Sequence, residues 1–355
     1  MSMPWRKKAI KEILAEINRS AETHLLEIRL PKLSSINLYI KDETSHKTGS
    51  LKHRLARSLY LYGLCNGWID KDTTIIEASS GNTAVSEAYF ASLLGLKFIA
   101  VMPKTISQTK IKRIQLYGGD CVFIDNAKID RSVAEQLAQE INGHFMDQFT
   151  FAERAVDWRG NNNIAESIFR QMAQERYPIP CWIVCGAGTG GTAATLGRYI
   201  QYALHPTKLC VVDPEDSVLY DYYQTRDSSV TMPSCSRIEG IGRSYIPASF
   251  FPNVISHMMK IPDAGSIAAL HFLEKLTGLR FGASTGTTLY GSFKLIANLL
   301  QENKPGSLVA IAGDSGHLYN ETYYNQDWLK EKNINIDPYL EQIWNFYDTG
   351  EWINI

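Results

Sequence analysis

The sequence predicts an α/β protein with mostly parallel sheets, divided into two domains. Strand-like and helix-like segments alternate through most of the chain, and parallel strands joined by crossover helices produce this alternation. The chain has 355 residues, of which 45% are hydrophobic, and such a length is sufficient for two hydrophobic cores. Glycine-rich and hydroxyl-rich segments follow several predicted strands. In parallel sheets, the loops beyond the carboxyl ends of the strands bind ligands.

The first half of the chain contains regularly spaced apolar segments. Leu51, Leu55 and Leu59 recur at the four-residue spacing of one helix face, and Ser50 is a suitable N-cap. Pro103 ends one apolar run, and Gly118-Gly119 ends one helical segment. The predicted strands are 36–41, 74–78, 98–102 and 121–124, and the predicted helices are 51–65, 84–94, 108–117 and 132–141.

The second half continues the alternation. The predicted strands are 182–185, 209–212 and 308–312, and the predicted helices are 163–175, 192–202, 267–276 and 287–300. Residues 215–265 have the weakest periodicity, so we expect a long surface excursion there. The tail from about Asp327 is rich in Trp and Tyr, and we expect it to pack on a surface or on a partner subunit.

Composition excludes several classes of function. The 36 basic and 37 acidic residues give a net charge of −1, so nucleic acid and membrane surfaces are not expected partners. The longest apolar runs have the length of a strand, and the basic N-terminus has no apolar segment after it, so we expect no membrane helix and no secretory signal. The six cysteines form no Cys-x-x-Cys pair. We therefore expect free thiols in the cytoplasm and no metal site.

One predicted loop suits a phosphate group. Residues 186–192 read Gly-Ala-Gly-Thr-Gly-Gly-Thr between a strand and a helix. Glycines let the backbone approach a ligand closely, and the N–H groups at a helix start favour an anion. The segment also matches the dinucleotide fingerprint, with Asp213 about 20 residues further on. A nicotinamide enzyme and a purely structural glycine turn are therefore alternatives.

A second loop suits a carboxylate. Residues 79–83 read Ser-Ser-Gly-Asn-Thr between another strand and helix. Hydroxyls, an amide and backbone N–H groups at a helix start can bind a carboxylate. An ordinary helix cap is the alternative, because Ser, Asn and Thr favour that position anyway.

Lys52 follows the Gly49-Ser50 turn in the first turn of a predicted helix. A cation near a helix N-terminus is electrostatically disfavoured, and a covalent bond to a cofactor aldehyde removes that charge. A solvated surface lysine is the alternative.

Together, the Lys52 segment and the two loops resemble the cysteine synthase and cystathionine β-synthase family of pyridoxal-phosphate enzymes over about residues 36–325. The resemblance implies pyridoxal 5′-phosphate, a homodimer, and the tryptophan-synthase-β-like fold (fold type II), in which the cofactor lies between two three-layer α/β/α domains. We expect the smaller domain, with the substrate loop, at 44–150. The larger domain, with the phosphate loop, is expected at 1–43 and 151–330, and a C-terminal extension at 331–355.

The resemblance also implies roles for individual residues. Lys52 corresponds to the lysine that binds the cofactor covalently and acts as general base. Asn82 corresponds to a ligand of the cofactor's ring oxygen, and Ser284 corresponds to the serine that faces the pyridine nitrogen. The phosphate loop corresponds to Gly188, Thr189, Gly190, Gly191 and Thr192. The substrate corresponds to a site formed by Ser79, Ser80, Gly81, Asn82, Thr83, Gln148 and Gly240.

Longer stretches resemble the bacterial L-cysteine desulfhydrase branch of the family, namely 47–69, 77–96 and 146–169. Thr-Phe-Ala-Glu-Arg follows Gln148-Phe149, and Asp-Ser-Gly-His stands at 314–317; both depart from true cysteine synthases. We therefore expect β-elimination of L-cysteine to sulfide, pyruvate and ammonia. Cysteine synthase-type β-replacement on O-acetylserine, or on a related β-substituted alanine, is the alternative, and a non-catalytic regulator is a third possibility.

Several other residues have simpler interpretations. His53 is expected to pack and Asn163 to cap a helix, whereas His317 fits either the cofactor edge or the surface. Asp213 is expected to be a strand-end residue. A bulky side chain at Gly190 is expected to weaken cofactor retention more than folding.

Overall fold

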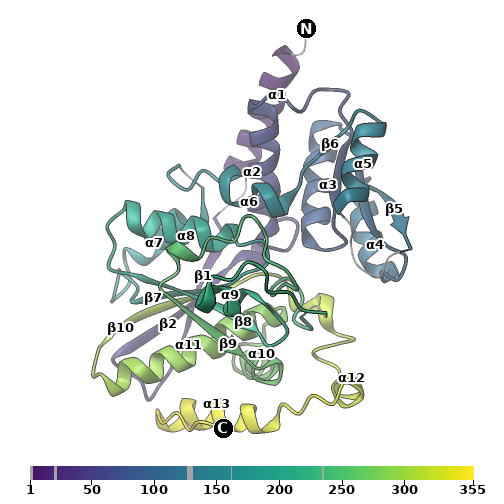
Figure 1. Ribbon diagram of the computed structural model, residues 1–355. Coiled ribbons are helices and arrows are strands. Elements are labelled where there is room, and N and C mark those ends of the chain that lie inside the picture. The colour runs from purple at the N-terminus through teal and green to yellow at the C-terminus, as the bar shows by residue number, and fades with distance from the viewer. Residues whose placement is uncertain (1–2, 20–21, 126–130, 161, 234–235) are drawn as a thin grey trace. The chain divides into compact units, whose positions relative to one another are not determined.

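The computed structural model describes residues 3–19, 22–125, 131–160, 162–233 and 236–355 (Figure 1). The chain divides into two compact units. Unit 1 contains the described residues of Met1–Glu22 and His46–Asp157, and unit 2 contains those of Thr23–Ser45 and Trp158–Ile355. None of the helices in these ranges is both long enough and apolar enough to span a bilayer.

Unit 1 is built on a four-stranded parallel sheet in the order β5-β4-β3-β6. Alternate strand residues face opposite sides: Ile75 and Phe98 pack with α2, α3 and α4, whereas Ile76 and Val101 pack with α5. The result is a three-layer α/β/α arrangement. The elements are α1 (Met3–Arg19), α2 (Lys52–Cys65), β3 (Ile75–Ala78), α3 (Asn82–Leu94), β4 (Phe98–Pro103), α4 (Gln108–Gln115), β5 (Asp120–Ile124), α5 (Arg131–Glu140), β6 (His144–Phe145) and α6 (Gln148–Ala155).

The helix α1 belongs to unit 1, which differs from the domain boundaries expected from the sequence. Residues 1–43 were expected in the larger domain, but Ala9 and Ile13 lie in the same hydrophobic cluster as Leu55 and Leu59 of α2. Burial of this apolar stripe attaches α1 to the smaller unit, and the chain enters unit 2 only at Thr23.

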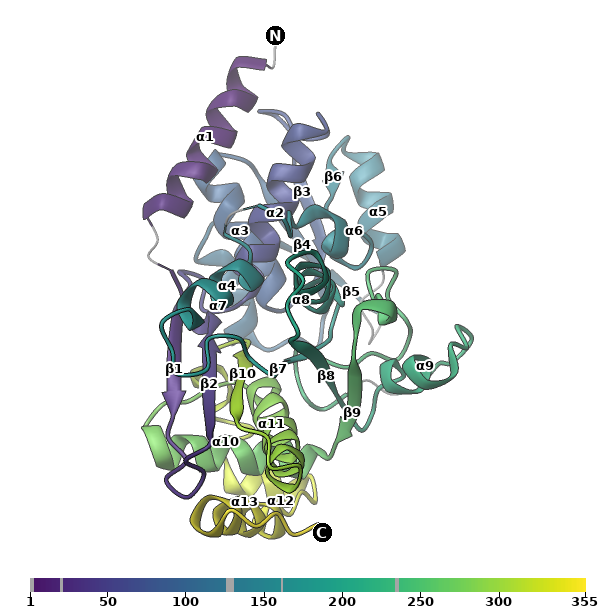
Figure 2. The ribbon, with the colours of Figure 1, turned by 90° about the vertical axis from the view of Figure 1, so that its left-hand side faces the viewer.

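Unit 2 contains a six-stranded sheet in the order β1-β2-β10-β7-β8-β9 (Figure 2). Only β1 is antiparallel to its neighbour. Leu38, Val184 and Leu308 face α10 and α11, whereas Tyr39, Ile183 and Val309 face α7 and α8. The elements are β1 (His24–Ile28), β2 (Ile36–Asp42), η1 (Glu43–Ser45), α7 (Ile164–Met172), β7 (Trp182–Gly186), α8 (Gly191–Tyr202), β8 (Lys208–Pro214), α9 (Leu219–Thr225), η2 (Pro252–Val254), β9 (His257–Ile261), α10 (Asp263–Thr277), α11 (Ala283–Gln301), β10 (Gly306–Ala312), η3 (Gly316–Tyr319), α12 (Gln326–Glu331) and α13 (Asp337–Thr349).

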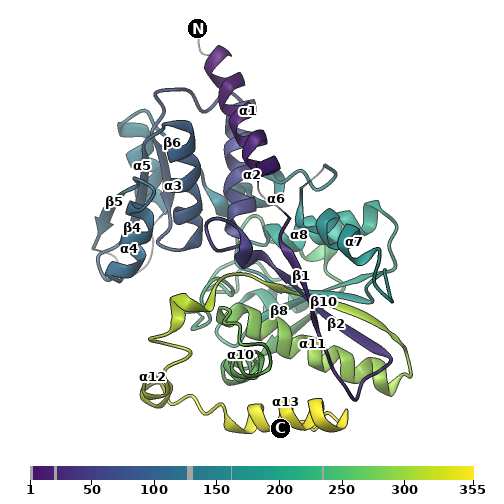
Figure 3. The same cartoon turned by 180° about the vertical axis from the view of Figure 1, so that it is seen from behind.

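Two regions of unit 2 are more regular than the sequence indicates. The segment 215–265, expected as an irregular excursion, contains α9 and the edge strand β9. The tail forms α12 and α13, and α13 packs against α10 with Ile343 and Phe346 fully buried (Figure 3). These residues complete the core on one face of the sheet, so the tail packs on the surface of unit 2, one of the two expected arrangements.

Candidate active site

Lys52 is the first residue of α2 and is half-buried. The turn before it closes through a hydrogen bond from Gly49 N to His46 O at 2.7 Å, and Gly49 has a positive φ of 75°. Ser50 is not the N-cap; Leu51 holds that position, although Lys52 N donates to Ser50 Oγ at 3.3 Å. The turn thus fixes Lys52 at the start of a buried helix, as expected.

The segment 79–83 joins β3 to α3 in unit 1. Ser79 and Thr83 are buried, and Gly81 is the N-cap of α3. Gly81 N donates to Ser79 Oγ at 3.3 Å, and a Cβ built on Gly81 would have no neighbour within 4 Å. Open space therefore adjoins the backbone at the positive end of α3, which is suitable for a carboxylate.

Gln148 begins α6 and lies beside this loop. Thr83 Oγ1 donates to Gln148 Oε1 at 2.7 Å. Gln148 N donates to Glu77 Oε2 at 3.1 Å, which ties α6 to β3. The structure thus brings together two of the predicted substrate residues that lie 65 positions apart in the sequence.

Asn82 has a partner that the sequence analysis missed. Arg113 Nη2, from α4, donates to Asn82 Oδ1 at 3.1 Å. This bond orients the amide so that Nδ2 is directed away from Arg113. No motif marks Arg113, because it is one of several basic residues on an amphipathic helix.

The glycine loop of unit 2 follows β7 and leads into α8. Thr189 is buried and its hydroxyl accepts from Gly191 N at 3.3 Å. A Cβ on Gly188 would lie 2.3 Å from Gly240 O, and Gly242 N donates to Ala187 O at 2.8 Å. The segment around Gly240 therefore supports the loop directly, and the positive end of α8 at this loop favours an anion.

The fold requires a glycine at position 190 even without a bound cofactor. The expectation that a bulky side chain there would affect cofactor retention more than folding is therefore wrong. The φ of Gly190 is +91°, and a Cβ there would lie 2.6 Å from Phe250 Cα and from Ser249 O. A side chain would collide with backbone rather than only with a bound phosphate. We therefore expect substitution of Gly190 to reduce folding stability as well as cofactor retention.

Arg243 is a second residue that the sequence analysis missed. A Cβ built on Gly188 would lie 2.9 Å from Arg243 Nη2, so the guanidinium lies beside the glycine loop. Arg243 Nη1 donates to Gly242 O at 2.8 Å, and Arg243 N donates to Ser217 Oγ at 3.0 Å. A fixed cation next to a phosphate-type loop adds electrostatic attraction for an anion. In the sequence, only the position of Arg243 just after the Gly240–Gly242 segment could have indicated that it lies near the glycine loop.

Ser284 lies in the first turn of α11 and is buried. The helix start is held at the end of β10, because Gly282 N donates to Asp314 O at 2.9 Å and a Cβ on Gly282 would collide with the Asp314 carboxylate. Since β10 pairs in parallel with β7, Ser284 and the glycine loop lie at the same edge of the sheet, as expected.

The remaining candidates are structural or exposed. His53 is buried, its Nε2 lies 3.2 Å from Glu16 Oε1, and its ring contacts the ring of Phe90. The predicted packing role of His53 is therefore confirmed. Asn163 caps α7 by accepting from Glu166 N at 2.9 Å, whereas Asn161 is outside the described residues. His317 is exposed and lines a surface pocket with Asp42 and Arg280.

Asp213 is the next-to-last residue of β8 and is fully buried, with Oδ2 accepting from Tyr220 N at 2.9 Å. In a dinucleotide-binding site, this carboxylate would have to be accessible to the ribose. The burial of Asp213 therefore argues against the dinucleotide interpretation. Burial raises the pKa of Asp213 to about 7.

This raised pKa has a consequence for stability. Between about pH 4 and 7 the folded state retains a proton that the unfolded state has lost, so stability falls as the pH rises through this window. Asp213→Asn should remove this loss, on the order of 2–4 kcal/mol. Urea unfolding at pH 4.5 and pH 8 measures the effect, and an unchanged pH slope in the variant would contradict it.

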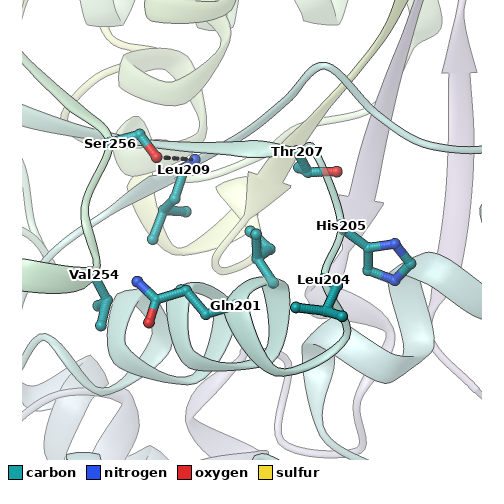
Figure 4. A pocket seen from close by; sticks show the side chains of 9 residues that line it. Gln201, Leu204, His205, Thr207, Leu209, Val254 and Ser256 are labelled. Carbon is teal, nitrogen blue, oxygen red and sulfur yellow. Dashed lines mark hydrogen bonds between the residues drawn. The ribbon is translucent and has the colours of Figure 1, made fainter.

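A surface pocket of about 400 Å³ lies at the other end of α8, between that helix, η2 and β8 (Figure 4). Gln201, His205 and Ser256 line it, and Ser256 Oγ accepts from Leu209 N at 3.1 Å. The glycine loop precedes the opposite end of this 12-residue helix, and the nearest lining residue, Gly197, lies about 9 Å along the helix axis from Gly191. The pocket is therefore separate from the predicted site.

Comparison with known proteins identifies the family. Residues 20–313 match the family model described as pyridoxal-phosphate dependent enzyme. The chain belongs to this family. It is 53% identical over 342 residues to the L-cysteine desulfhydrase Cds1 of Mycobacterium tuberculosis (strain ATCC 25177 / H37Ra), which covers 95% of this chain and 92% of that protein.

Solved structures confirm the fold of this pyridoxal-phosphate dependent enzyme. O-ureido-L-serine synthase matches with a TM-score of 0.75 and 23% identity, over 88% of this chain and 98% of that one. A hydrogen sulfide-producing enzyme from Fusobacterium nucleatum matches with a TM-score of 0.71 and 26% identity, over 87% and 97%. The fold predicted from the sequence, tryptophan-synthase-β-like, is therefore confirmed.

The residues of unit 2 fit the family's cofactor. The first turn of α8 offers backbone N–H groups, Thr189 and Thr192 offer hydroxyls, and Arg243 adds a positive charge beside Gly188. A dianionic phosphate requires this kind of donor set. Pyridoxal phosphate supplies an electron-withdrawing group for amino-acid chemistry, and the chain supplies the binding and proton-transfer groups.

Proposed function

We propose that this protein is an L-cysteine desulfhydrase, which converts L-cysteine and water to sulfide, pyruvate and ammonia. The observation that carries the proposal is the 53% identity to L-cysteine desulfhydrase Cds1 over 95% of this chain. The similarity to a hydrogen sulfide-producing enzyme at 26% identity supports the same chemistry.

In this proposal, Lys52 binds the cofactor covalently and later acts as the general base. Its Nζ accepts the proton from Cα of the substrate. Lys52 suits this task because the Gly49 turn fixes it at the start of α2 and the residue is half-buried. Pyridoxal phosphate would supply the electron-withdrawing group that makes the Cα proton acidic enough for Lys52 to accept it.

The substrate carboxylate is assigned to Ser79, Ser80, Gly81, Asn82 and Thr83, together with Gln148. The start of α3 provides N–H donors and a favourable dipole. The hydrogen bond between Thr83 and Gln148 fixes the geometry of the two side chains. A carboxylate held there orients Cα of the substrate, and Gly240 completes the substrate site by resemblance.

Ser284 is assigned to the cofactor's ring nitrogen and Asn82 to its ring oxygen. A serine hydroxyl is neutral, so it does not keep that nitrogen protonated as a carboxylate would. Electron withdrawal is then moderate, and loss of a good leaving group from Cβ is favoured over reactions that need a long-lived carbanion. Sulfide is such a leaving group.

The phosphate is assigned to Gly188, Thr189, Gly190, Gly191 and Thr192. Thr192 gives the cleanest test, because its side chain is partly exposed in the first turn of α8. Thr192→Val keeps the shape and removes the hydroxyl, and we expect cofactor affinity to fall roughly 10–100-fold from loss of one hydrogen bond to a charged group. Equilibrium dialysis against free pyridoxal phosphate measures it; Thr277→Val, at the exposed end of α10, is the control expected to retain the wild-type affinity.

The direct test of the reaction compares two substrates. Purified enzyme is incubated with L-cysteine while sulfide and pyruvate are measured, and separately with O-acetylserine and sulfide while cysteine is measured. Equal release of sulfide and pyruvate from cysteine is the expected result. Cysteine formation without sulfide release would instead make the protein a β-replacement synthase.

We also propose a homodimer in the cytoplasm. The free cysteines and the family resemblance support this assignment. Sedimentation equilibrium at micromolar concentration should give twice the chain mass of 39.9 kDa.

A further inference from the structure

Two buried carboxyl groups lie next to each other behind the substrate loop. Glu77 on β3 and Glu87 on α3 are both fully buried, and each acts on the other as a direct neighbour. Neither has a role in the chemistry assigned above. An acidic pair in a protein interior requires an explanation, because buried charges are costly.

The two carboxyl groups have different surroundings. Glu77 Oε1 accepts from Ala78 N at 2.8 Å, and Oε2 accepts from Gln148 N at 3.1 Å. Within the described ranges, no N–H or O–H donor reaches either oxygen of Glu87. Glu77 is therefore the better site for a negative charge, and Glu87 is the better site for a proton.

Electrostatics agrees with this assignment. Burial raises the pKa of Glu77 to about 7, and burial together with the neighbouring Glu77 raises the pKa of Glu87 well above its ordinary value. Ionisation of both adjacent carboxyl groups is unfavourable because the two negative charges repel each other. The pair therefore retains one proton at neutral pH.

We propose that Glu87 is a positioning residue for the substrate carboxylate: as a neutral acid it donates a hydrogen bond to Glu77, which in turn holds the backbone of Gln148 beside Thr83. The chain of contacts runs from Glu87 to the Glu77 carboxylate, from Glu77 Oε2 to Gln148 N, and from Gln148 Oε1 to Thr83 Oγ1. The inference rests on the proposed function, because it takes Gln148 as a substrate ligand.

Other charged groups around the pair are few. Lys52 of α2 lowers the pKa of Glu87, Asp147 raises that of Glu77, and Asp147 itself pairs with Arg131. Tyr60 OH donates to the backbone oxygen of Glu87 at 2.8 Å. The strand β4 has no titratable side chain. On the other two packed helices, Arg113 of α4 bonds to Asn82, and Glu16 of α1 bonds to His53 and Tyr89.

The arrangement has a consequence at alkaline pH. Loss of the shared proton would leave two negative charges in the interior, and Glu77 would then be repelled from its position. Gln148 would lose its backbone partner, so the KM for the amino-acid substrate should rise with pH while kcat changes little.

Two substitutions separate this role from simple packing. Glu87→Gln keeps the shape and a donor but cannot titrate, so it should retain the wild-type KM at pH 7 within about twofold and abolish the alkaline rise in KM. Glu87→Leu has similar size and no donor, so it should raise KM roughly tenfold with kcat nearly unchanged, because Glu77 and Gln148 lose their support.

Two further readouts do not depend on turnover. Difference infrared spectra of wild-type holoenzyme minus Glu87→Gln should contain the carbonyl band of a protonated carboxylic acid at pH 7. Hydrogen exchange of the peptide that contains Gln148 should be faster in Glu87→Leu than in Glu87→Gln.

The outcomes distinguish this inference from the proposed function. If cysteine is not a substrate but the infrared band is present and exchange at Gln148 responds to Glu87, only the proposed function fails. Absence of the band, an alkaline rise in KM that persists in Glu87→Gln, or unchanged exchange in Glu87→Leu would each overturn the inference. If Glu87→Leu does not fold, the band and the pH profile of Glu87→Gln decide.

Discussion

Lys52→Ala is expected to abolish sulfide release from cysteine and covalent retention of the cofactor. The substitution removes the only atom to which the proposal assigns both covalent attachment and proton abstraction. Loss of a general base alone costs about 10²–10⁴-fold in rate, so the combined loss should leave no turnover above background. Rates of sulfide and pyruvate formation in freshly reconstituted enzyme measure this.

A matched control uses the neighbouring lysine. Lys47 is exposed, with Nζ 5.3 Å from the ring centre of Tyr89, and Lys47→Ala should keep the wild-type rate. Unfolding of Lys52→Ala in urea should match wild type closely, because Lys52 is only half-buried. Turnover by Lys52→Ala at more than a few percent of the wild-type rate would remove Lys52 from the mechanism.

Gly190→Val is expected to cause the largest loss of stability among substitutions in the glycine loop. The positive φ of 91° is strained for valine, and its Cβ would lie 2.6 Å from the backbone of Phe250. Strain and overpacking together cost about 2–5 kcal/mol. The midpoint of guanidinium unfolding, measured without added cofactor, should fall accordingly.

Gly118→Ala separates backbone strain from collision. Gly118 also has a positive φ, of 76°, but a Cβ there meets nothing within 4 Å. Its substitution should therefore cost only about 1–2 kcal/mol. If Gly190→Val unfolds at the wild-type midpoint and differs only in cofactor affinity, the phosphate would be the sole reason for that glycine.

The sequence was sufficient for the elements and loops that depend on local chemistry. Apolar spacing located α2 and β4 to within one residue at their starts, and glycine with hydroxyl residues marked the starts of α3 and α8. Such signals are local, since they depend on helix periodicity, capping and the conformational freedom of glycine. The resemblance then assigned roles that periodicity alone could not give.

The rest depended on tertiary packing. Nothing near Arg113 or Arg243 in sequence indicates that one reaches Asn82 and the other lies beside Gly188. Glu87 occupies an ordinary helix position, and only the fold reveals that it is buried against Glu77. Likewise, α1 joins unit 1 because Ile13 finds its partners 40 residues and more along the chain.

The most direct test of the account is the location of the covalent bond to the cofactor. Holoenzyme is reduced with borohydride and digested, and the peptide that carries the pyridoxyl group is sequenced by mass spectrometry. The account predicts a single modified residue, Lys52. Modification at any other lysine, or a protein that carries no reducible pyridoxal phosphate, would contradict it.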